Sequence, residues 1–433
     1  MTIRPDPAEF LHAERGDVSP ERCATMLDAF LTGFGNPARE VDRLLEENPA
    51  SAFGHCLRIA LAVRADNIDA RARVLQSIAT IETVCPARNH LARRHAFAAR
   101  AWLDGDQALA LDRYGAIVVE VPRDIVALAV AHALDFRLGL RRMLRDRIAQ
   151  VLSDWHDEMP CYASVLAMYA FGLEEDGQYL RAEKIARRAL ELDPRHPGAV
   201  HVIAHVMEMQ GRWREGLEFL AATESGWKDT SFAVHLAWHR ALFHLEAGDA
   251  PSALAVYDDA IARSSSMSEL ADASALLWRL QLGNVWVGPR WSRLADHWEH
   301  HALAGTRMFY TAHAVMAFAC ARRTCAVQRI FDQLRAEHGE NPNSDDALAL
   351  PLCTALSAFA RGDFAGCIER LVRVRHIAHQ CGGSLAQCDV IQLTLAEAAL
   401  RANKADLARS LIAERVAQKP SSRLNRRLEQ RLA

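Results

Sequence analysis

Residues 163–196 read ASVLAMYAFGLEEDGQYLRAEKIARRALELDPRH, a pattern of two helices joined by a short turn. Apolar residues recur at helical spacing over 164–175 and again over 180–192. Gly177 can adopt the left-handed conformation that ends a helix, and Pro194 stops the second helix. The segment therefore predicts one antiparallel helix pair of 34 residues.

The same punctuation recurs on both sides of this pair. A helical pattern over 197–210 ends at Gly211, and Gly105 and Gly248 stand at equivalent turns. Each second helix carries a small residue that lets the two helices approach closely: Ala110, Ala182, Gly216 and Ala253. A single pair cannot bury its apolar face, so successive pairs must stack. The sequence predicts an all-α fold, a tetratricopeptide-like helical-repeat superhelix of stacked antiparallel helix pairs.

Three parts of the chain differ in their regularity. Residues 1–50 combine an irregular N-terminal segment with a first helix, and residues 51–337 form the helical-repeat core. Residues 338–433 supply C-terminal repeats and a capping helix. The basic stretch Arg423–Arg431 is typical of the solvated helix that closes a repeat array, and we do not expect it to bind nucleic acid.

Composition excludes several classes of protein. Half of the 433 residues are hydrophobic and 24% are charged, a balance typical of soluble globular proteins. The net charge of −3 gives no basic field, so no nucleic-acid partner is expected. No apolar stretch reaches the about 18 residues that a membrane span requires, and no signal-peptide core is present, so no membrane partner is expected. Ten cysteines without a Cys-x-x-Cys pair indicate a reduced, cytoplasmic protein.

Motifs in the middle of the chain carry a closer resemblance. They read VHVIAHVMEM (200–209), HLAWHRAL (235–242), DASALLWRL (272–280) and VGPRW (287–291), with Tyr257 and Asp258 between the second and third. In this order they resemble the tetratricopeptide-repeat protein 38 family, also called StaR-like, over roughly residues 54–313. The resemblance implies the repeat fold rather than a defined reaction. The chain departs from the family pattern at Thr311, where an Asp is expected before His313.

Repeat register predicts a polar site on the inner face of the array. His201, His205 and Glu208 are spaced by four and three residues, which keeps them on one helix face. In proteins that resemble this repeat, that face lines the concave surface where ligands bind. The equivalent positions of other units hold imidazole, aromatic and carboxylate side chains: His95, Phe136, Phe171, Glu174, His235 and Trp238.

Acid–base chemistry is one use of such a surface. Histidine titrates near neutral pH and can exchange protons with a carboxylate in a groove screened from water. The candidate catalytic residues are His201, His205, Glu208, His235 and His239. The other candidate ligand-binding residues, which would orient a polar or anionic molecule, are Tyr257, Asp258, Asp272, Arg279 and His313. The alternative interpretation is structural: histidines packed between helices, and an ion pair of Asp272 with Arg279.

A metal site is a further alternative. Two histidines four residues apart on a helix can bind one zinc ion, so His201 and His205 would be the metal ligands, with Glu208 or His235 as a third. The glutamate does not lie between the histidines, so the His-Glu-x-x-His arrangement of metalloproteases is absent. The interpretation we favour from sequence has no cofactor and no metal.

Two functions from different classes stay open. The first is a pocket for a small polar or anionic molecule, with or without acid–base catalysis, because the predicted wall is rich in histidine and aromatic residues. The second is a scaffold that binds a peptide or protein partner along its concave face. Nucleotide-binding and hydrolase motifs are missing: the chain has no Gly-x-Gly-x-x-Gly, Gly-x4-Gly-Lys-Ser/Thr or Gly-x-Ser-x-Gly. The sequence does not decide whether the protein is an enzyme.

Overall fold

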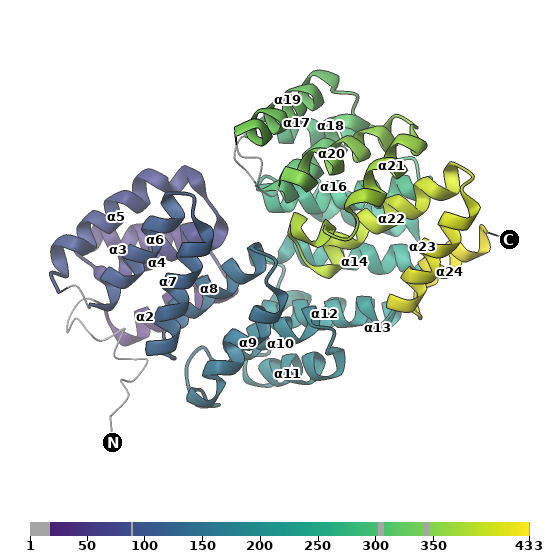
Figure 1. The fold of residues 1–433 in the computed structure, drawn as a ribbon. Coiled ribbons are helices and arrows are strands. Elements are labelled where there is room, and N and C mark those ends of the chain that lie inside the picture. The colour runs from purple at the N-terminus through teal and green to yellow at the C-terminus, as the bar shows by residue number, and fades with distance from the viewer. Residues whose placement is uncertain (1–17, 88–89, 302–306, 341–345, 433) are drawn as a thin grey trace. The chain divides into compact units, whose positions relative to one another are not determined.

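The computed structural model describes residues 18–432 apart from 88–89, 302–306 and 341–345, and these residues are almost entirely helical (Figure 1). The one extended pairing in the described ranges is an isolated bridge between Phe34 and Thr230. Within the same ranges, no helix is both long and apolar enough to span a membrane. Residues 1–17, which belong to the predicted irregular segment, lie outside the described residues.

Contacts divide the chain into two compact units. The first unit comprises the described residues up to Ile203 together with Ser225–Phe232, and the second comprises Ala204–Glu224 and the residues from Ala233 onward. The division falls inside helix α12 (Pro197–Met209), which contributes a half to each unit. Each unit is therefore described by itself.

The first unit consists of short helices in the order of the chain. Its helices are α2 (Pro20–Thr32), α3 (Pro37–Glu47), α4 (Ala52–Ala65), α5 (Arg71–Val84), α6 (Leu91–Leu103), α7 (Gln107–Glu120), α8 (Ile125–Arg137), α9 (Arg141–Val151), α10 (Tyr162–Glu175) and α11 (Tyr179–Leu192), with short 3-10 turns at Ile68–Ala70 and Leu152–Asp154. Neighbours pack as antiparallel pairs, of which α10 with α11 is the pair that the opening stretch predicts.

Local signals explain where the first helices begin. Ser19 and Asn36 accept hydrogen bonds from backbone amides at the starts of α2 and α3, and a proline occupies the first position of each helix. The described part of residues 1–50 therefore holds two capped helices, where we expected an irregular segment and a single helix. The sequence analysis did not predict the earlier helix, α2, because the segment from Gly33 to Pro37 looked irregular. In the structure, Gly33 has a φ of 74° and ends α2 as its cap.

The close approach of α10 to α9 in the first unit depends on Gly172. A Cβ on Gly172 of α10 would lie 2.4 Å from the backbone nitrogen of Arg145 in α9. Gly105 and Gly177 end their helices with φ of 85° and 77°, as the sequence predicts for left-handed caps. The repeat therefore follows from small residues at the crossings and glycines at the turns.

The second unit continues the alternation from the end of α12. Its further helices are α13 (Trp213–Ala222), α14 (Ala233–Ala247), α15 (Ala250–Val256), the π-helix η4 (Tyr257–Ile261), α16 (Met267–Leu282), α17 (Arg290–Glu299), α18 (Met308–Cys320), α19 (Thr324–Glu340), α20 (Asp346–Ala360), α21 (Phe364–Val374), α22 (Leu385–Arg401), α23 (Ala405–Gln418) and α24 (Arg423–Gln430), with 3-10 turns at Glu224–Gly226 and Ala378–Cys381. The first helices of successive pairs, α14, α16, α18, α20 and α22, pack side by side.

Late helices of the second unit return to early ones. The α22 helix contacts α16, where Trp278 Nε1 donates to Thr394 Oγ1 at 2.9 Å. The α24 helix contacts α14, where the Arg427 guanidinium donates to the carbonyl oxygens of Leu245 at 2.7 Å and Glu246 at 3.1 Å. These returns enclose the inner faces of α14 and α16, so the second unit can hold a cavity.

The fold is an all-α, tetratricopeptide-like array of stacked helix pairs, as the sequence predicts. Residues Arg423–Gln430 form the terminal helix α24, and Arg427 and Arg431 make hydrogen bonds to other helices. The predicted part boundaries, after residues 50 and 337, stay predictions.

Candidate functional site

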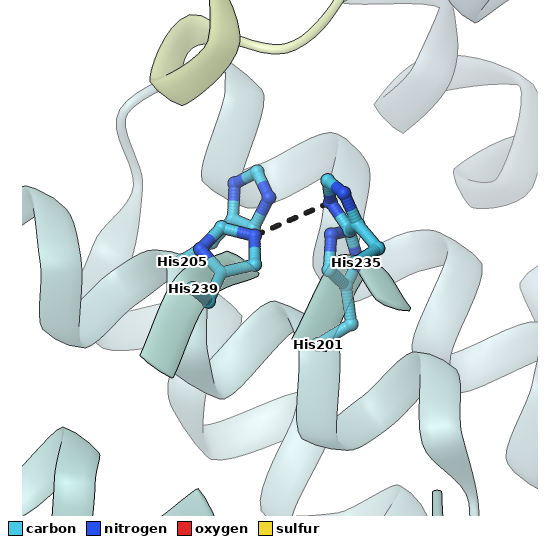
Figure 2. Close-up of side chains that lie close together, drawn as sticks. All are labelled: His201, His205, His235 and His239. Carbon is cyan, nitrogen blue, oxygen red and sulfur yellow. Dashed lines mark hydrogen bonds between the residues drawn. The ribbon is translucent and has the colours of Figure 1, made fainter. Parts of the chain in front are cut away.

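A cluster of histidines lies in the second unit where α12 and α14 meet. His205 comes from α12, and His235 and His239 stand one turn apart on α14. Figure 2 shows these rings turned toward one another, with His201 one turn before His205. Their spacing of four residues places both α14 imidazoles on one helix face. The cluster therefore follows from one local pattern, His-x3-His, and one contact between neighbouring helices.

Each histidine of α14 is held by a carboxylate from another helix. His235 Nδ1 lies 2.7 Å from Asp272 Oδ2, and His239 Nδ1 lies 2.9 Å from Glu208 Oε2. The two Nε2 atoms are 3.3 Å apart, which is the dashed line in Figure 2. Asp272 is itself fixed, because its Oδ1 accepts a hydrogen bond from Gln387 at 3.1 Å. The carboxylates thus orient both rings.

The two imidazoles of α14 differ in their electrostatics. Burial lowers the pKa of His239 well below its ordinary value, and the positive charges of His205, His235, Lys419 and Arg279 lower it further. Burial also lowers the pKa of His235, but the charge and hydrogen bond of Asp272, together with Glu208, raise it net above its ordinary value. His235 therefore holds a proton more strongly than His239 does.

Trp238 connects this cluster to a buried arginine. Its ring stacks on His235 with centroids 5.3 Å apart and planes inclined by 15°. The guanidinium carbon of Arg279 lies 5.3 Å from the Trp238 ring centroid, a cation–π distance. Trp238 is fully buried and Arg279 is 7% exposed. The arginine is thus held beside the histidines by an aromatic plane.

A cavity of about 350 Å³ adjoins the cluster inside the second unit. Glu208 and Arg279 belong to its wall, so both residues are shared between the cluster and the cavity. The other charged side chains of the wall are Glu246, Asp389, Glu397, Arg415, Lys419, Arg427 and Arg431. Leucines, Phe243 and Trp213 supply the apolar part. A volume of this size suits a small metabolite.

Three ion pairs join six of the nine charged side chains in the wall. Lys419 Nζ lies 3.4 Å from Glu208 Oε1, Arg415 binds Asp389 at 2.8 Å, and Arg431 binds Glu397 at 2.7 Å. Arg279 and Arg427 instead donate to backbone carbonyl oxygens, and neither has a carboxylate within 4.0 Å among the described residues. Five cations against four carboxylates leave one positive charge in excess in the described wall.

Of Arg279 and Arg427, Arg279 is the more deeply buried. Burial lowers the pKa of its guanidinium, and the carboxylates of Asp389 and Glu208 offset this lowering only in part. An arginine stays protonated in proteins even so. Arg279 is therefore a buried positive charge that faces the cavity.

Several predicted site residues belong to the first unit. His95 is fully buried, and its Nε2 lies 2.8 Å from the Asp124 carboxylate. That His95 joins the other histidines stays a prediction. The His201 ring contacts Phe171 and Phe232. Phe136 packs against Phe171, and Glu174 is completely buried.

Other predicted residues lie in the second unit but outside the cavity wall. Asp258 binds Arg290 on the surface, and Tyr257 is buried in the π-helix η4, where burial raises its pKa. The His313 Nδ1–H donates to the Phe309 carbonyl at 2.7 Å, and burial lowers its pKa to about 4. The expected ion pair of Asp272 with Arg279 does not form, because Asp272 binds His235 and Gln387.

The C-terminal helices supply residues that sequence reasoning missed. Asp389, Arg415, Lys419, Arg427 and Arg431 all line the cavity. No local pattern in the sequence points to them, since Lys419 reaches Glu208 across 211 residues. His235 and His239, which the sequence analysis also singled out, share the His-x3-His spacing that drew attention to His201 and His205. That signal was present in the sequence.

The chain has structural neighbours of low sequence identity among known proteins. No family model matches the chain. The chain is similar to human IFIT1, solved as a dimer with m7Gppp-AAAA, at 13% identity over 96% of this chain and 94% of that one, with a TM-score of 0.44. It is also similar to a chain in the structure of Naa15/Naa10 bound to HypK-THB, at 12% identity over 91% of this chain and 67% of that one, with a TM-score of 0.26.

Proposed function

We propose that the second unit binds a small molecule carrying a carboxylate or phosphate group in its cavity. The observation that carries this proposal is Arg279, a buried cation in the wall whose described partners are backbone carbonyls rather than carboxylates. A buried charge without a counter-ion is costly, and an anion of the ligand would supply the missing charge. Arginine is also the residue that best matches planar carboxylate and phosphate groups.

The size and mixed character of the wall support a small polar ligand. Leucine, Phe243 and Trp213 surfaces would cover the apolar part of such a molecule. Six of the other charged side chains form three ion pairs, Glu208 with Lys419, Asp389 with Arg415 and Glu397 with Arg431, which fixes their positions before binding. Preorganised groups of this kind favour recognition of one small molecule over an extended peptide.

Glu208 gives the predicted acid–base chemistry a defined position. One oxygen accepts from His239 and the other lies near Lys419, and the residue is part of the cavity wall. A proton could therefore pass between the cluster and a bound molecule through this carboxylate. Catalysis itself stays a prediction.

The test uses simple anions and two matched arginine variants. We would measure the melting temperature of the whole chain with increasing inorganic phosphate and succinate, and follow either anion that raises it by calorimetry. Arg279→Lys keeps a positive charge but loses the planar guanidinium. Arg290→Lys changes an arginine that is paired with Asp258 outside the cavity, and it serves as the control.

We expect one of the two anions to stabilise the wild type and Arg290→Lys, and to have at least tenfold lower affinity for Arg279→Lys. Equal stabilisation of all three proteins would mean that the anion binds elsewhere. No stabilisation by either anion would count against the proposal and favour a protein-binding scaffold.

We also propose that the chain belongs to the tetratricopeptide-repeat protein 38 family and that the protein is cytoplasmic. Some of the motif residues that resemble the tetratricopeptide-repeat protein 38 family, His205, His235, His239 and Asp272 among them, build the cluster, which supports membership. No disulfide bond joins any of the ten cysteines within the described residues, which supports a cytoplasmic protein.

A further inference from the structure

The histidine cluster poses a problem of proton placement. The nearest carboxylates, Asp272 and Glu208, act as hydrogen-bond acceptors when the Nδ1 atoms of His235 and His239 are the donors. A neutral imidazole has a single N–H. Both Nε2 atoms then present lone pairs to each other across 3.3 Å. A proton or a metal ion between the two atoms would join these lone pairs.

The distance between these atoms suits a metal ion. Two nitrogens that each lie about 2.0–2.1 Å from a tetrahedral zinc ion are about 3.3–3.4 Å apart. The Nε2 atoms of His235 and His239 already have this separation. Both atoms also come from rings that are oriented at their far side, so little rearrangement is needed.

A third imidazole completes the ligand set. His205 offers a ring nitrogen within 4.8 Å of one nitrogen each of His235 and His239, and its ring centroid lies 4.6 Å from that of His239. His205 and His239 are fully buried, so a site there would be closed on the side of these rings. Three histidines with one open position are the ligand set of many catalytic zinc sites.

The surroundings match those of known metal centres. A histidine that binds a metal through one nitrogen usually donates its other N–H to a carboxylate, which fixes the tautomer and strengthens the ligand. Asp272 and Glu208 occupy these positions for His235 and His239. Their two negative charges would also balance a divalent cation.

From this geometry we propose that His205, His235 and His239 bind one zinc-type divalent metal ion, with Asp272 and Glu208 as positioning residues. Imidazole ligands suit zinc best among the common divalent ions, with copper and nickel as competitors. The ligand set differs from the pair expected from sequence, because His201 belongs to the first unit and its ring contacts Phe171 and Phe232. The site does not depend on the anion proposed for the cavity.

The test is zinc binding to the whole chain without an affinity tag. Protein stripped with a chelator would be titrated with zinc chloride by calorimetry, and cobalt(II) would report the ligand geometry through its visible absorption. His235→Ala/His239→Ala removes two ligands. His376→Ala/His379→Ala removes two exposed histidines of the same unit and is the control. Asp272→Asn keeps all three ligands and changes only the orienting carboxylate.

We expect one zinc ion per chain in the wild type and in the control. The double variant of α14 should bind at least 100-fold more weakly, and Asp272→Asn about 10–100-fold more weakly. If the α14 variant fails to fold by circular dichroism, the Asp272→Asn affinity and the tetrahedral cobalt spectrum of the wild type decide. Absence of stoichiometric zinc binding, or equal binding by Asp272→Asn and wild type, would overturn the proposal and leave a shared proton between the rings.

Discussion

Glu208 Oε2 lies 2.9 Å from His239 Nδ1, a hydrogen bond that joins two helices across 31 residues of sequence. The other oxygen of the same carboxylate lies 3.4 Å from Lys419 Nζ. One side chain therefore connects the histidine cluster, the cavity wall and the C-terminal helices. A substitution at Glu208 should therefore affect the histidine cluster, the cavity wall and the packing of the C-terminal helices.

Replacing Glu208 should destabilise the protein. Glu208→Ala removes the acceptor of a fully buried imidazole, and loss of such a partner costs about 1–3 kcal/mol in the free energy of unfolding. Glu208→Gln should cost less, because its amide oxygen can still accept from Nδ1. Urea denaturation of both variants measures the difference. Glu215→Ala, at an exposed carboxylate that binds Arg212, is the control and should cost under about 1 kcal/mol. Equal stability of Glu208→Ala and Glu215→Ala would contradict the role of Glu208.

Replacing one partner of the Asp389–Arg415 ion pair should lower the free energy of unfolding more than replacing both partners does. Arg415 is buried and binds both carboxylate oxygens of Asp389. Burial would raise the pKa of Asp389, but Arg415, Lys419 and Arg279 hold it below its ordinary value. Arg415→Leu leaves that charge uncompensated and should cost about 3–5 kcal/mol, whereas Asp389→Leu/Arg415→Leu should cost clearly less. A double variant as unstable as Arg415→Leu would refute this in the same denaturation assay.

Gly216 sets the distance between α13 and α14. A Cβ at this position would lie 2.4 Å from the Phe243 ring, which lines the cavity. Gly216→Ala should therefore destabilise the protein by about 1–3 kcal/mol through overpacking. Combining it with Phe243→Leu should recover part of that loss, so a double-mutant cycle would give a favourable coupling energy. Purely additive effects would show that the ring moves aside freely.

Acid should destabilise the first unit through His196. Its Nδ1 accepts from the Ala199 amide at 3.1 Å, and its Nε2–H donates to Ser164 at 2.9 Å, so the folded state requires a neutral ring. Burial is the main cause that lowers the pKa of His196 to about 4, with Asp193 partly opposing it. As the pH falls from about 6.5 to about 4, the unfolded chain takes up a proton that the folded chain refuses. Stability is present above this window and is lost through it.

The matched variant for this effect is His196→Asn, which keeps an acceptor for the Ala199 amide but does not titrate. Between pH 6.5 and 4, its unfolding free energy should fall less steeply than that of the wild type, by up to about 1.4 kcal/mol per pH unit. Other buried histidines, such as His313, titrate in both proteins and cancel in the comparison. Parallel curves for the two proteins would rule out His196 as a source of acid sensitivity.

Local patterns explain most of what the sequence predicted. The helix pairs depend on glycines with positive φ and small residues at crossings, and both act within one repeat. The same holds for His235 and His239, whose spacing places them on one face of α14. Repeat register alone was a weaker guide to which side chains lie together. His95 shares the register of the site residues but is paired with Asp124 in the first unit.

The cavity could not be predicted from the sequence, for a physical reason. Its wall joins α14 and α16 to α22, α23 and α24, and the contacts between them span more than 100 residues. Side-chain partners such as Arg427 and the Leu245 carbonyl meet only through tertiary packing. Periodicity describes each helix and its immediate neighbour, and it carries no information on where the array turns back on itself.

The return of α24 to α14 has a consequence for how the protein is made. A ribosome releases α14 and α16 long before it has synthesised Lys419 and Arg427, which are 211 and more than 180 residues beyond their partners. During that interval the nascent chain can form its early helix pairs but exposes the faces that later become the cavity wall. Ligand-binding capacity should therefore arise late in translation, as a single event, and chains stalled before residue 419 should be helical yet inactive in binding.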